Sequence, residues 1–473
     1  SDSILPGEAY WLWVVPPEGT TSLELIIPYV GLTDDNGDSG DSGDSGEGGE
    51  GGEGGDEGGD GDSDEGGDGG DAGDGDGDSS DDDNDGDDNG NDALASINDF
   101  QYAGSFRLTN GEYGSSTLDY SVGALAHNPT NNSLYIAGRA PDQSVAEYPI
   151  VSPGMSSDVA SLPESGAPLQ NFVNLLSSAP NPQGVDRITG LYWLDGSLIV
   201  NAEKWYDAGG NGTDTTLVVT DANNLAGNVS GYFQMQGAAN SAGYMGPIPE
   251  EWQSAFGASH YTGWSSVYSI ISRYSLGPSL WSFDASALVN RGNNANMSVA
   301  ARAHVNYAYS STAPERHLSP GALDWAQQGT AGPFPQANPL WNPLSKGRYG
   351  FFVPGTRTFA VLGHTEGLQS GIGYKAVQSD GSVCPGPCPF NPEDRTNYFW
   401  FYDVDDILSA TNIYDVRPYD YGEFNVPFDL NGTRPIIGAT FDPASSTLYL
   451  AIENAAQLGT YDRPPLIVTY RLP

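Results

Sequence analysis

The chain has 473 residues and a formal net charge of −45, from 62 acidic and 17 basic side chains. So large a negative charge repels phosphate and anionic lipid, so we expect neither a nucleic-acid-binding protein nor one that binds anionic membrane surfaces. No run of about 18 apolar residues occurs, and the sequence therefore predicts no membrane-spanning helix. The length allows one large domain with appendages, or two to three domains.

The chain begins with a short apolar stretch, residues 1–33, which we interpret as two strands, Tyr10–Val15 and Ser22–Val30. Two isolated strands are marginal in water, and this pair carries more apolar surface than a protein leaves exposed. The stretch could fold back on its own body, but we predict that it docks on a neighbouring copy and so builds a homopolymer. The residues expected to be buried in this contact are Trp11, Trp13, Leu23, Leu25, Ile27 and Tyr29.

Residues 34–92 form a tract of Gly, Asp, Glu, Ser and Asn that holds 26 of the acidic residues. It lacks the apolar side chains that a core needs. Glycine recurs at every third position from Gly37 to Gly61, so the tract is either a self-repelling flexible tether or an ordered rod of the polyproline II type. Dense carboxylates predict weak Ca²⁺ binding, and no organic cofactor is expected. The candidate ligands are Asp81, Asp82, Asp83 and Asp85 in the tract and Asp207 and Asp214 in a later glycine-rich loop.

Features of the sequence suggest a secreted protein at the cell surface or outside the cell. Cys384 and Cys388 stand in the run Cys-Pro-Gly-Pro-Cys, and a disulfide is their expected state in an oxidising compartment. The chain begins at Ser1, so we expect a processed form from which a leader has been removed. Five sequons offer candidate glycan sites, namely Asn131, Asn211, Asn228, Asn296 and Asn431.

Residues 93–473 have an all-β composition, with short alternating stretches such as Phe100–Leu108. A pattern of strand, tight turn and second strand recurs along this body. Its best copies are G-A-L-A-H-N-P-T-N-N-S-L-Y-I-A at 123–137 and G-A-T-F-D-P-A-S-S-T-L-Y-L-A at 438–451, and weaker copies lie at 189–200 and 349–361. A third strand ending in Asp follows at 216–222, 279–285 and 398–404.

Repeated units of this size resemble the blades of β-propellers in general, without pointing to a particular propeller family. The resemblance implies about five blades, near 119–151, 186–222, 262–288, 348–407 and 436–472, with 289–347 as an insertion or a degenerate sixth. Phe100–Leu108 would pair with Leu466–Leu472 and close the ring. A β-sandwich or a β-helix is the alternative.

Aligning the second strands brings four polar residues to equivalent positions, each six residues past the Ser or Thr that opens its strand. They are Arg139, Glu203, His364 and Glu453. Equivalent positions in a propeller point to the same face, so we expect them to ring a funnel that binds a sugar, a metal or a charged peptide. Glu203 and Glu453 are then the candidate catalytic carboxylates. A solvated salt-bridge network without a ligand is the alternative.

Two functions from different classes follow. The first is an extracellular structural or adhesive protein, a subunit of a surface filament in which residues 1–33 dock on the next copy. The second is a secreted carbohydrate-active hydrolase. The detached apolar stretch favours the first, because an enzyme has no need of it, and carbohydrate remains a candidate partner in both.

Overall fold

The computed structural model describes residues 93–207, 209–265, 275–289, 297–310, 313–319 and 337–472. The chain divides into two units, Ser1–Asp82 and Asp83–Pro473, and every described residue belongs to the second. The predictions made for residues 1–92, including the apolar docking residues and Asp81, Asp82, Asp83 and Asp85, therefore lie outside the described residues, as does Asn296.

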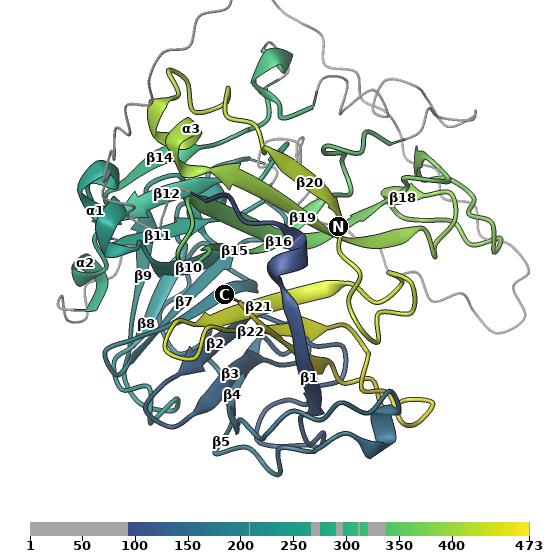
Figure 1. Ribbon diagram of the computed structural model, residues 1–473. Helices are drawn as coiled ribbons and strands as arrows, with labels where there is room; N and C mark the ends of the chain where they lie inside the picture. Colours follow the sequence, from purple (N-terminus) through teal and green to yellow (C-terminus); the bar gives the residue numbers. More distant parts are fainter. Residues whose placement is uncertain are drawn as a thin grey trace, which may run out of the picture. The chain divides into compact units, whose positions relative to one another are not determined.

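The body is a five-bladed β-propeller, which confirms the expected fold class (Figure 1). Each blade is an antiparallel sheet whose first strand lies innermost, and adjacent innermost strands contact one another around a closed ring. The first blade consists of β2 (Leu125–Asn128), β3 (Ser133–Ala137), β4 (Ser144–Pro149) and β5 (Gln170–Asn174). The second blade consists of β6 (Arg187–Leu194), β7 (Ser197–Glu203), β8 (Thr216–Val219) and β9 (Val229–Met235). The third blade consists of β10 (Tyr244–Pro247), β11 (His260–Gly263), β12 (Leu280–Phe283) and β14 (Ala301–Val305). The fourth blade consists of β15 (Lys346–Phe352), β16 (Thr358–Glu366), β19 (Arg395–Asp403) and β20 (Asp420–Glu423). The fifth blade consists of β21 (Ile436–Asp442), β22 (Thr447–Ile452), β23 (Leu466–Arg471) and β1 (Gln101–Arg107).

The ring closes between the two ends of the body, as predicted. Strand β1 pairs antiparallel with β23, from Gln101 opposite Arg471 to Arg107 opposite Leu466. Residues 289–347, which the sequence left as an insertion or a sixth blade, contribute β14 to the third blade and the short β13 (Ser298–Val299) to the edge of the second. The described part of that segment therefore adds no further blade.

Turn chemistry explains the hairpins that begin the blades. In the second blade Asp195 and Gly196 both have positive φ, 47° and 83°, and join Leu194 to Ser197 in a two-residue turn. Asp-Gly is the sequence that such turns favour, because their twist matches that of the flanking strands. In the first and fifth blades a longer turn joins the first two strands, and Asn132 and Ser446 take the left-handed conformation there.

A bulge recurs near the start of three inner strands, at Thr189, Arg348 and Ile437. The inner strands also approach one another closely at two glycine pairs. A Cβ atom on Gly190 would collide with the carbonyl oxygen of Gly243, and one on Gly438 with that of Gly123. Only glycine fits these contacts, because every other residue carries a Cβ atom.

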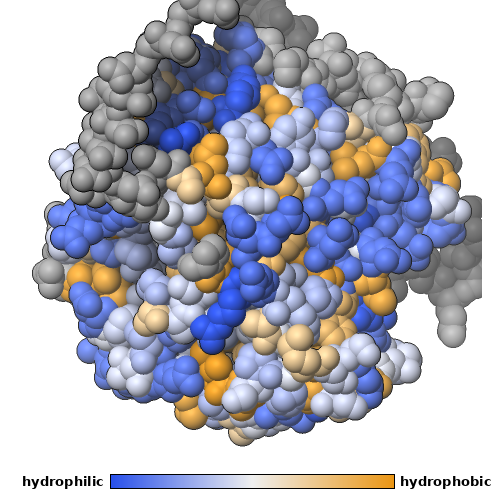
Figure 2. Space-filling model, viewed as in Figure 1, coloured by the Kyte–Doolittle hydropathy of each residue, from blue (hydrophilic) through white to orange (hydrophobic). Residues whose placement is uncertain are grey.

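The core lies between the blades, where the faces of neighbouring sheets pack together. Its largest cluster joins the third, fourth and fifth blades around Trp341, Trp400 and Phe401. Phe100, just before β1, stacks on Phe401 with ring centroids 5.7 Å apart and so fixes the start of the body against the fourth blade. The face seen in Figure 2 shows hydrophobic residues only in small groups among hydrophilic ones.

Helices are few and short, and they lie in the connections. The α-helices are α1 (Glu250–Phe256), α2 (Ser286–Val289) and α3 (Val404–Ser409), and the 3₁₀ helices are η1 (Ile97–Asp99), η2 (Val159–Ser161), η3 (Ala238–Ser241) and η5 (Pro314–Arg316).

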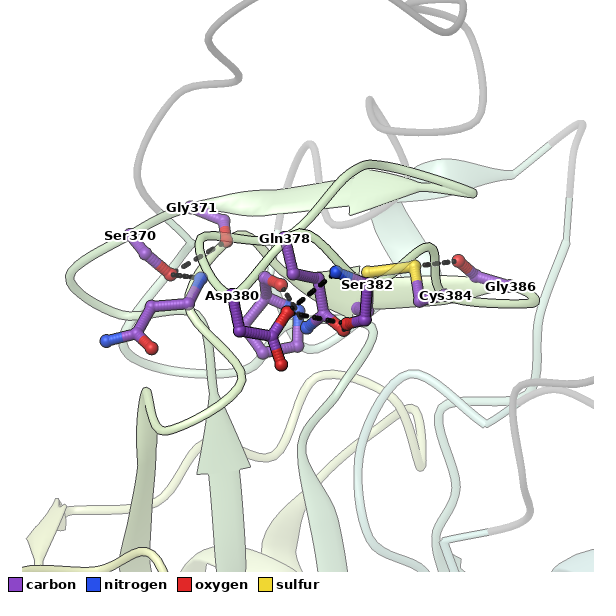
Figure 3. The surroundings of a disulfide bond; sticks show 10 residues. Ser370, Gly371, Gln378, Asp380, Ser382, Cys384 and Gly386 are labelled. Atoms are coloured by element: carbon purple, nitrogen blue, oxygen red, sulfur yellow. Dashed lines mark hydrogen bonds between the residues drawn. A yellow bond between two sulfur atoms is a disulfide. The ribbon is translucent and has the colours of Figure 1, made fainter.

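A two-stranded excursion between β16 and β19 holds the disulfide. Its strands are β17 (Ile372–Tyr374) and β18 (Pro387–Pro389), and Cys384 is bonded to Cys388 within it (Figure 3). Asp380 accepts hydrogen bonds from the backbone N–H and the hydroxyl of Ser382 in the loop that precedes the bond. The excursion pairs only with itself, so the disulfide crosslinks a local loop and does not join blades.

Replacing Cys384 and Cys388 with serine is expected to have a small effect on the propeller. A crosslink that closes a five-residue loop removes little chain entropy, about 2 kcal/mol at most. Urea unfolding should show a loss no larger than this, while limited proteolysis should cut the excursion faster. A loss of the whole cooperative transition in the serine variant would contradict this expectation.

Candidate functional site

The five inner strands all run in the same direction along the axis, so the two faces of the propeller differ. The hairpin face is formed by the carboxyl ends of β2, β6, β10, β15 and β21 and by the turns that follow them. The opposite face is formed by the starts of the same strands and by the ends of the second strands, with which they pair antiparallel.

A cavity of about 500 Å³ opens on the hairpin face, and we call it the hairpin-face pocket. All five blades contribute to its lining, which is rich in aromatic rings. Its volume lies within the range of small-ligand sites, about 300–1,000 Å³. The aromatic residues of its lining are Tyr192, Trp193, Tyr261, Tyr349, Phe351, Phe352 and Phe441.

Hydrogen bonds and ring contacts hold the aromatic wall in place. The backbone N–H of Phe441 donates to the Tyr349 hydroxyl at 3.0 Å, and the Tyr261 hydroxyl donates to the carbonyl of Gly350 at 2.9 Å. Phe351 stacks on Phe441 with centroids 5.2 Å apart. Burial raises the pKa of Tyr349 and Tyr261 well above the ordinary value, so both phenols are neutral. The pocket is therefore preformed and largely apolar.

The charged groups of the pocket are few. His127 Nδ1 lies 3.6 Å from Asp442 Oδ1, and both side chains are nearly buried. Burial lowers the pKa of His127, although the charge of Asp442 opposes this shift. Asp195 and Glu251 also line the pocket and are exposed. The pocket thus offers aromatic faces with one buried polar pair at its edge.

The four polar residues aligned from the sequence lie at the opposite face. Glu203 ends β7 opposite Arg187, and His364 in β16 lies opposite Lys346. His364 Nδ1 is 3.2 Å from the carbonyl oxygen of Ile436. The backbone N–H of Glu453 donates to the carbonyl of Pro435, so Glu453 and His364 both flank the start of β21.

Arg139 follows β3 and is held in its own loop. Its guanidinium pairs with Asp142, with Nε 2.9 Å from Oδ2, and its side chain is 47% exposed. A funnel shared by Arg139, Glu203, His364 and Glu453 stays a prediction.

Three further charged residues join His364 in a network that the alignment did not reveal. Glu366 Oε1 lies 3.9 Å from Lys346 Nζ, 3.7 Å from Arg395 Nε and 3.9 Å from His364 Nε2. Burial is the main reason that the pKa of Lys346 is lowered to about 8; the charge of Glu366 opposes this shift, and the charges of Arg348 and Arg395 add to it. Burial, with Lys346 and Arg348 adding to it, also holds the pKa of His364 well below its ordinary value, so this histidine is neutral. These contacts are those of a salt-bridge network.

A second, small cavity of about 10 Å³ lies among residues of all five inner strands or their starts, including Gly190, Tyr244 and Gly438. Such a space holds about one water molecule. None of the residues of the charged network lines the hairpin-face pocket, so we treat the two as separate sites.

The candidate Ca²⁺ ligands Asp207 and Asp214 accept hydrogen bonds from groups of the protein itself. Asp207 is buried and accepts backbone N–H groups of Asn211 and Gly212, while Asp214 accepts from the Gln234 amide. The part of the chain that the structure describes contains no group of three or more His, Cys, Asp or Glu that could hold a metal ion. Ca²⁺ binding stays a prediction.

Among the sequons, Asn131, Asn211, Asn228 and Asn431 are exposed. The Asn131 amide donates to Glu147 at 3.0 Å, and Ser133 of the same sequon is buried and also donates to Glu147. A glycan on Asn131 would have to replace this contact. Glycosylation itself stays a prediction.

The hairpin-face pocket was missed by the sequence argument, although its signal was present. The aromatic residues at the ends of the repeated first strands, such as Tyr192, Phe351 and Phe441, fall at neighbouring positions of the aligned copies. The sequence argument used the second strands, and the charged residues at the ends of those strands lie at the opposite face.

The chain is thus a five-bladed β-propeller with a largely apolar cavity at one end of its axis. The sequence matches no protein-family model and none of the curated proteins with which it was compared. Within the described ranges, no helix is long and apolar enough to cross a membrane.

Proposed function

We propose that this is an extracellular structural or adhesive protein whose propeller holds an aromatic or ring-shaped group of a partner in the hairpin-face pocket. The pocket itself carries the proposal, because all five blades line it and four of them supply its Tyr, Trp and Phe residues. Apolar, aromatic-lined cavities with a few polar groups are the usual form of a ligand site. The Cys384–Cys388 disulfide supports an oxidising, extracellular setting.

The hydrolase alternative receives less support from the structure. A glycoside hydrolase needs two carboxyl groups on either side of one bond. Glu203 and Glu453, the candidates for this role, lie at the opposite face, away from the cavity. The pocket has carboxylates of its own, since Asp442 is paired with His127 and the exposed Asp195 and Glu251 also line it. Hydrolysis in the pocket therefore remains the second candidate function.

Replacing Ala444 with tryptophan tests the proposal. Ala444 is exposed in the turn after β21 and lines the pocket, so an indole there should fill the cavity without disturbing the core. Partners of the full-length wild-type protein are sought by binding to an oligosaccharide array and by sedimentation of the protein with itself. We expect each partner found to be lost, or bound at least about 30-fold more weakly, in Ala444→Trp.

Met155→Trp is the matched control, because Met155 is 68% exposed and lies outside the pocket lining. It should bind as the wild type does. If Ala444→Trp keeps its native circular dichroism spectrum and binds every partner as tightly as the control, the pocket is not the binding site and the proposal is wrong.

A further inference from the structure

The described chain begins beside the hairpin-face pocket. The backbone N–H of Arg357 donates to the carbonyl of Ala93 at 3.1 Å. Arg357 belongs to the turn between β15 and β16, the turn that also supplies Pro354 and Gly355 to the pocket lining. The described body therefore begins next to a turn that lines the pocket with its first residues.

Further contacts fix this starting point. The backbone N–H of Ala95 donates to the Thr358 hydroxyl at 2.9 Å, and the Tyr419 hydroxyl donates to the carbonyl of Ala95 at 2.7 Å. Ala95 is buried, and Phe100 is packed against Phe351, one of the aromatic residues of the pocket. The described chain thus starts on the face of the propeller that carries the pocket.

From this placement we infer that the occupant of the hairpin-face pocket is the aromatic run Tyr10–Val15 of a second copy of this chain, with Trp11 or Trp13 as the inserted side chain. The inference rests on the proposed function and names its partner. Both sides of the contact have matching chemistry, since the run reads Y-W-L-W-V-V and the pocket is lined mainly by aromatic and other apolar residues. Tryptophan is the side chain most enriched among residues that anchor interfaces in desolvated pockets.

The tether has the reach for a neighbouring copy. Residues 34–92 are 59 residues long, which as a flexible coil span about 40 Å root-mean-square and as an extended helix about 180 Å. Docking on its own pocket would require the tether to return to the point from which it starts, and this would fold its 26 carboxylates back on one another. Because charged linkers repel themselves and extend, the second copy is the favoured acceptor.

Such a contact joins two different surfaces of the same chain. An aromatic side chain of one copy that enters a pocket of the next makes a heterologous contact, which propagates into a ring or an open filament and does not stop at a dimer. The proposed extracellular role then has a structural basis in a chain of propellers linked through acidic tethers.

The test compares the self-association of full-length variants by sedimentation velocity and negative-stain microscopy. The donor variant is Trp11→Ala with Trp13→Ala, and the acceptor variants are Ala444→Trp and, on another blade, Pro247→Trp, whose exposed proline also lines the pocket. We expect the wild type to assemble and each of these variants to associate at least about 30-fold more weakly. The controls Thr20→Ala with Thr21→Ala, and Met155→Trp, should assemble as the wild type does.

Mixing the two kinds of variant identifies the direction of the contact. The Ala444→Trp protein keeps its donor and the Trp11→Ala, Trp13→Ala protein keeps its pocket, so together they should form a one-to-one heterodimer that cannot extend. The inference is overturned if the wild type is monomeric, if the pocket-blocked proteins assemble normally, or if the mixture stays monomeric.

The outcome also separates this inference from the proposed function. If Ala444→Trp loses oligosaccharide binding but assembles normally, the pocket binds a partner and the inference about the second copy is wrong. If neither oligosaccharide binding nor self-assembly depends on the pocket, the inference and the proposed function are both wrong.

Discussion

Replacing Gly438 with alanine is expected to destabilise the propeller by at least about 3 kcal/mol, or to prevent its folding. The new Cβ atom would collide with the backbone carbonyl of Gly123, which lies just before the adjacent inner strand β2. Backbone atoms cannot rotate away as a side chain does, and both strands are fixed by their own sheets. Forced overpacking of a close-packed interior costs about 1–3 kcal/mol, and a contact with backbone belongs at or above the upper end.

Gly459→Ala is the matched control for this prediction. Its Cβ atom would come no closer than 3.7 Å to a neighbour, the Cβ of Asp462, in an exposed turn. Urea unfolding of the control should agree with the wild type within about 0.5 kcal/mol. A Gly438→Ala protein that unfolds within about 1 kcal/mol of the wild type would show that the inner strands can separate without cost.

Acid is expected to destabilise the protein through its histidines, all five of which have a pKa lowered by burial. A lowered pKa favours the neutral form in the folded state, while the unfolded chain takes up protons near the ordinary value of 6.5. Their contribution to stability is therefore complete above pH 6.5 and is lost as the pH falls toward the folded pKa. For His304, whose pKa burial lowers to about 4, the loss between pH 6.5 and 4 amounts to about 3 kcal/mol.

His304→Gln tests this expectation through the slope of unfolding free energy against pH. His304 Nε2 hydrogen-bonds the Ser282 hydroxyl at 2.9 Å, and its ring contacts Phe256 with centroids 4.6 Å apart. The glutamine variant should be less stable at pH 7 but should lose less stability on going to pH 4.5. Ser282→Ala, which removes the partner but keeps the titrating group, should lower stability and retain most of the slope. An unchanged slope in His304→Gln would contradict the assignment.

The blade pattern could be predicted because it is local. A hairpin such as Gly438–Ala451 carries its strand alternation, its turn residues and its length in one stretch of sequence. The closing pair β1 and β23 could be predicted as well, since Phe100–Leu108 and Leu466–Leu472 are the two terminal strands of the repeated body. Other fourth strands of the blades, such as β14, have no counterpart in the repeated pattern and could not be predicted from it.

The sites depend on how separate blades meet, and the sequence of one blade does not contain that information. Lys346 and Glu366 flank their hairpin from its two ends, 20 residues apart in sequence, and Arg395 joins them from a third strand. The pocket likewise combines Tyr192 with Phe441 across several blades. An alignment of repeats gives the height of each residue along the axis, but it cannot show which side chains fill the space between strands.

The pairing of β1 with β23 also has a consequence for synthesis of the chain. About 360 residues separate these strands, so at ordinary translation rates β23 is synthesised about 20 to 70 seconds after β1. During that time the ring cannot close, and an edge of the fifth blade is open to other strands. A ribosome that stops before Leu466 would release a chain in which β1 has no partner strand, because β1 pairs only with β23 in the described sheet.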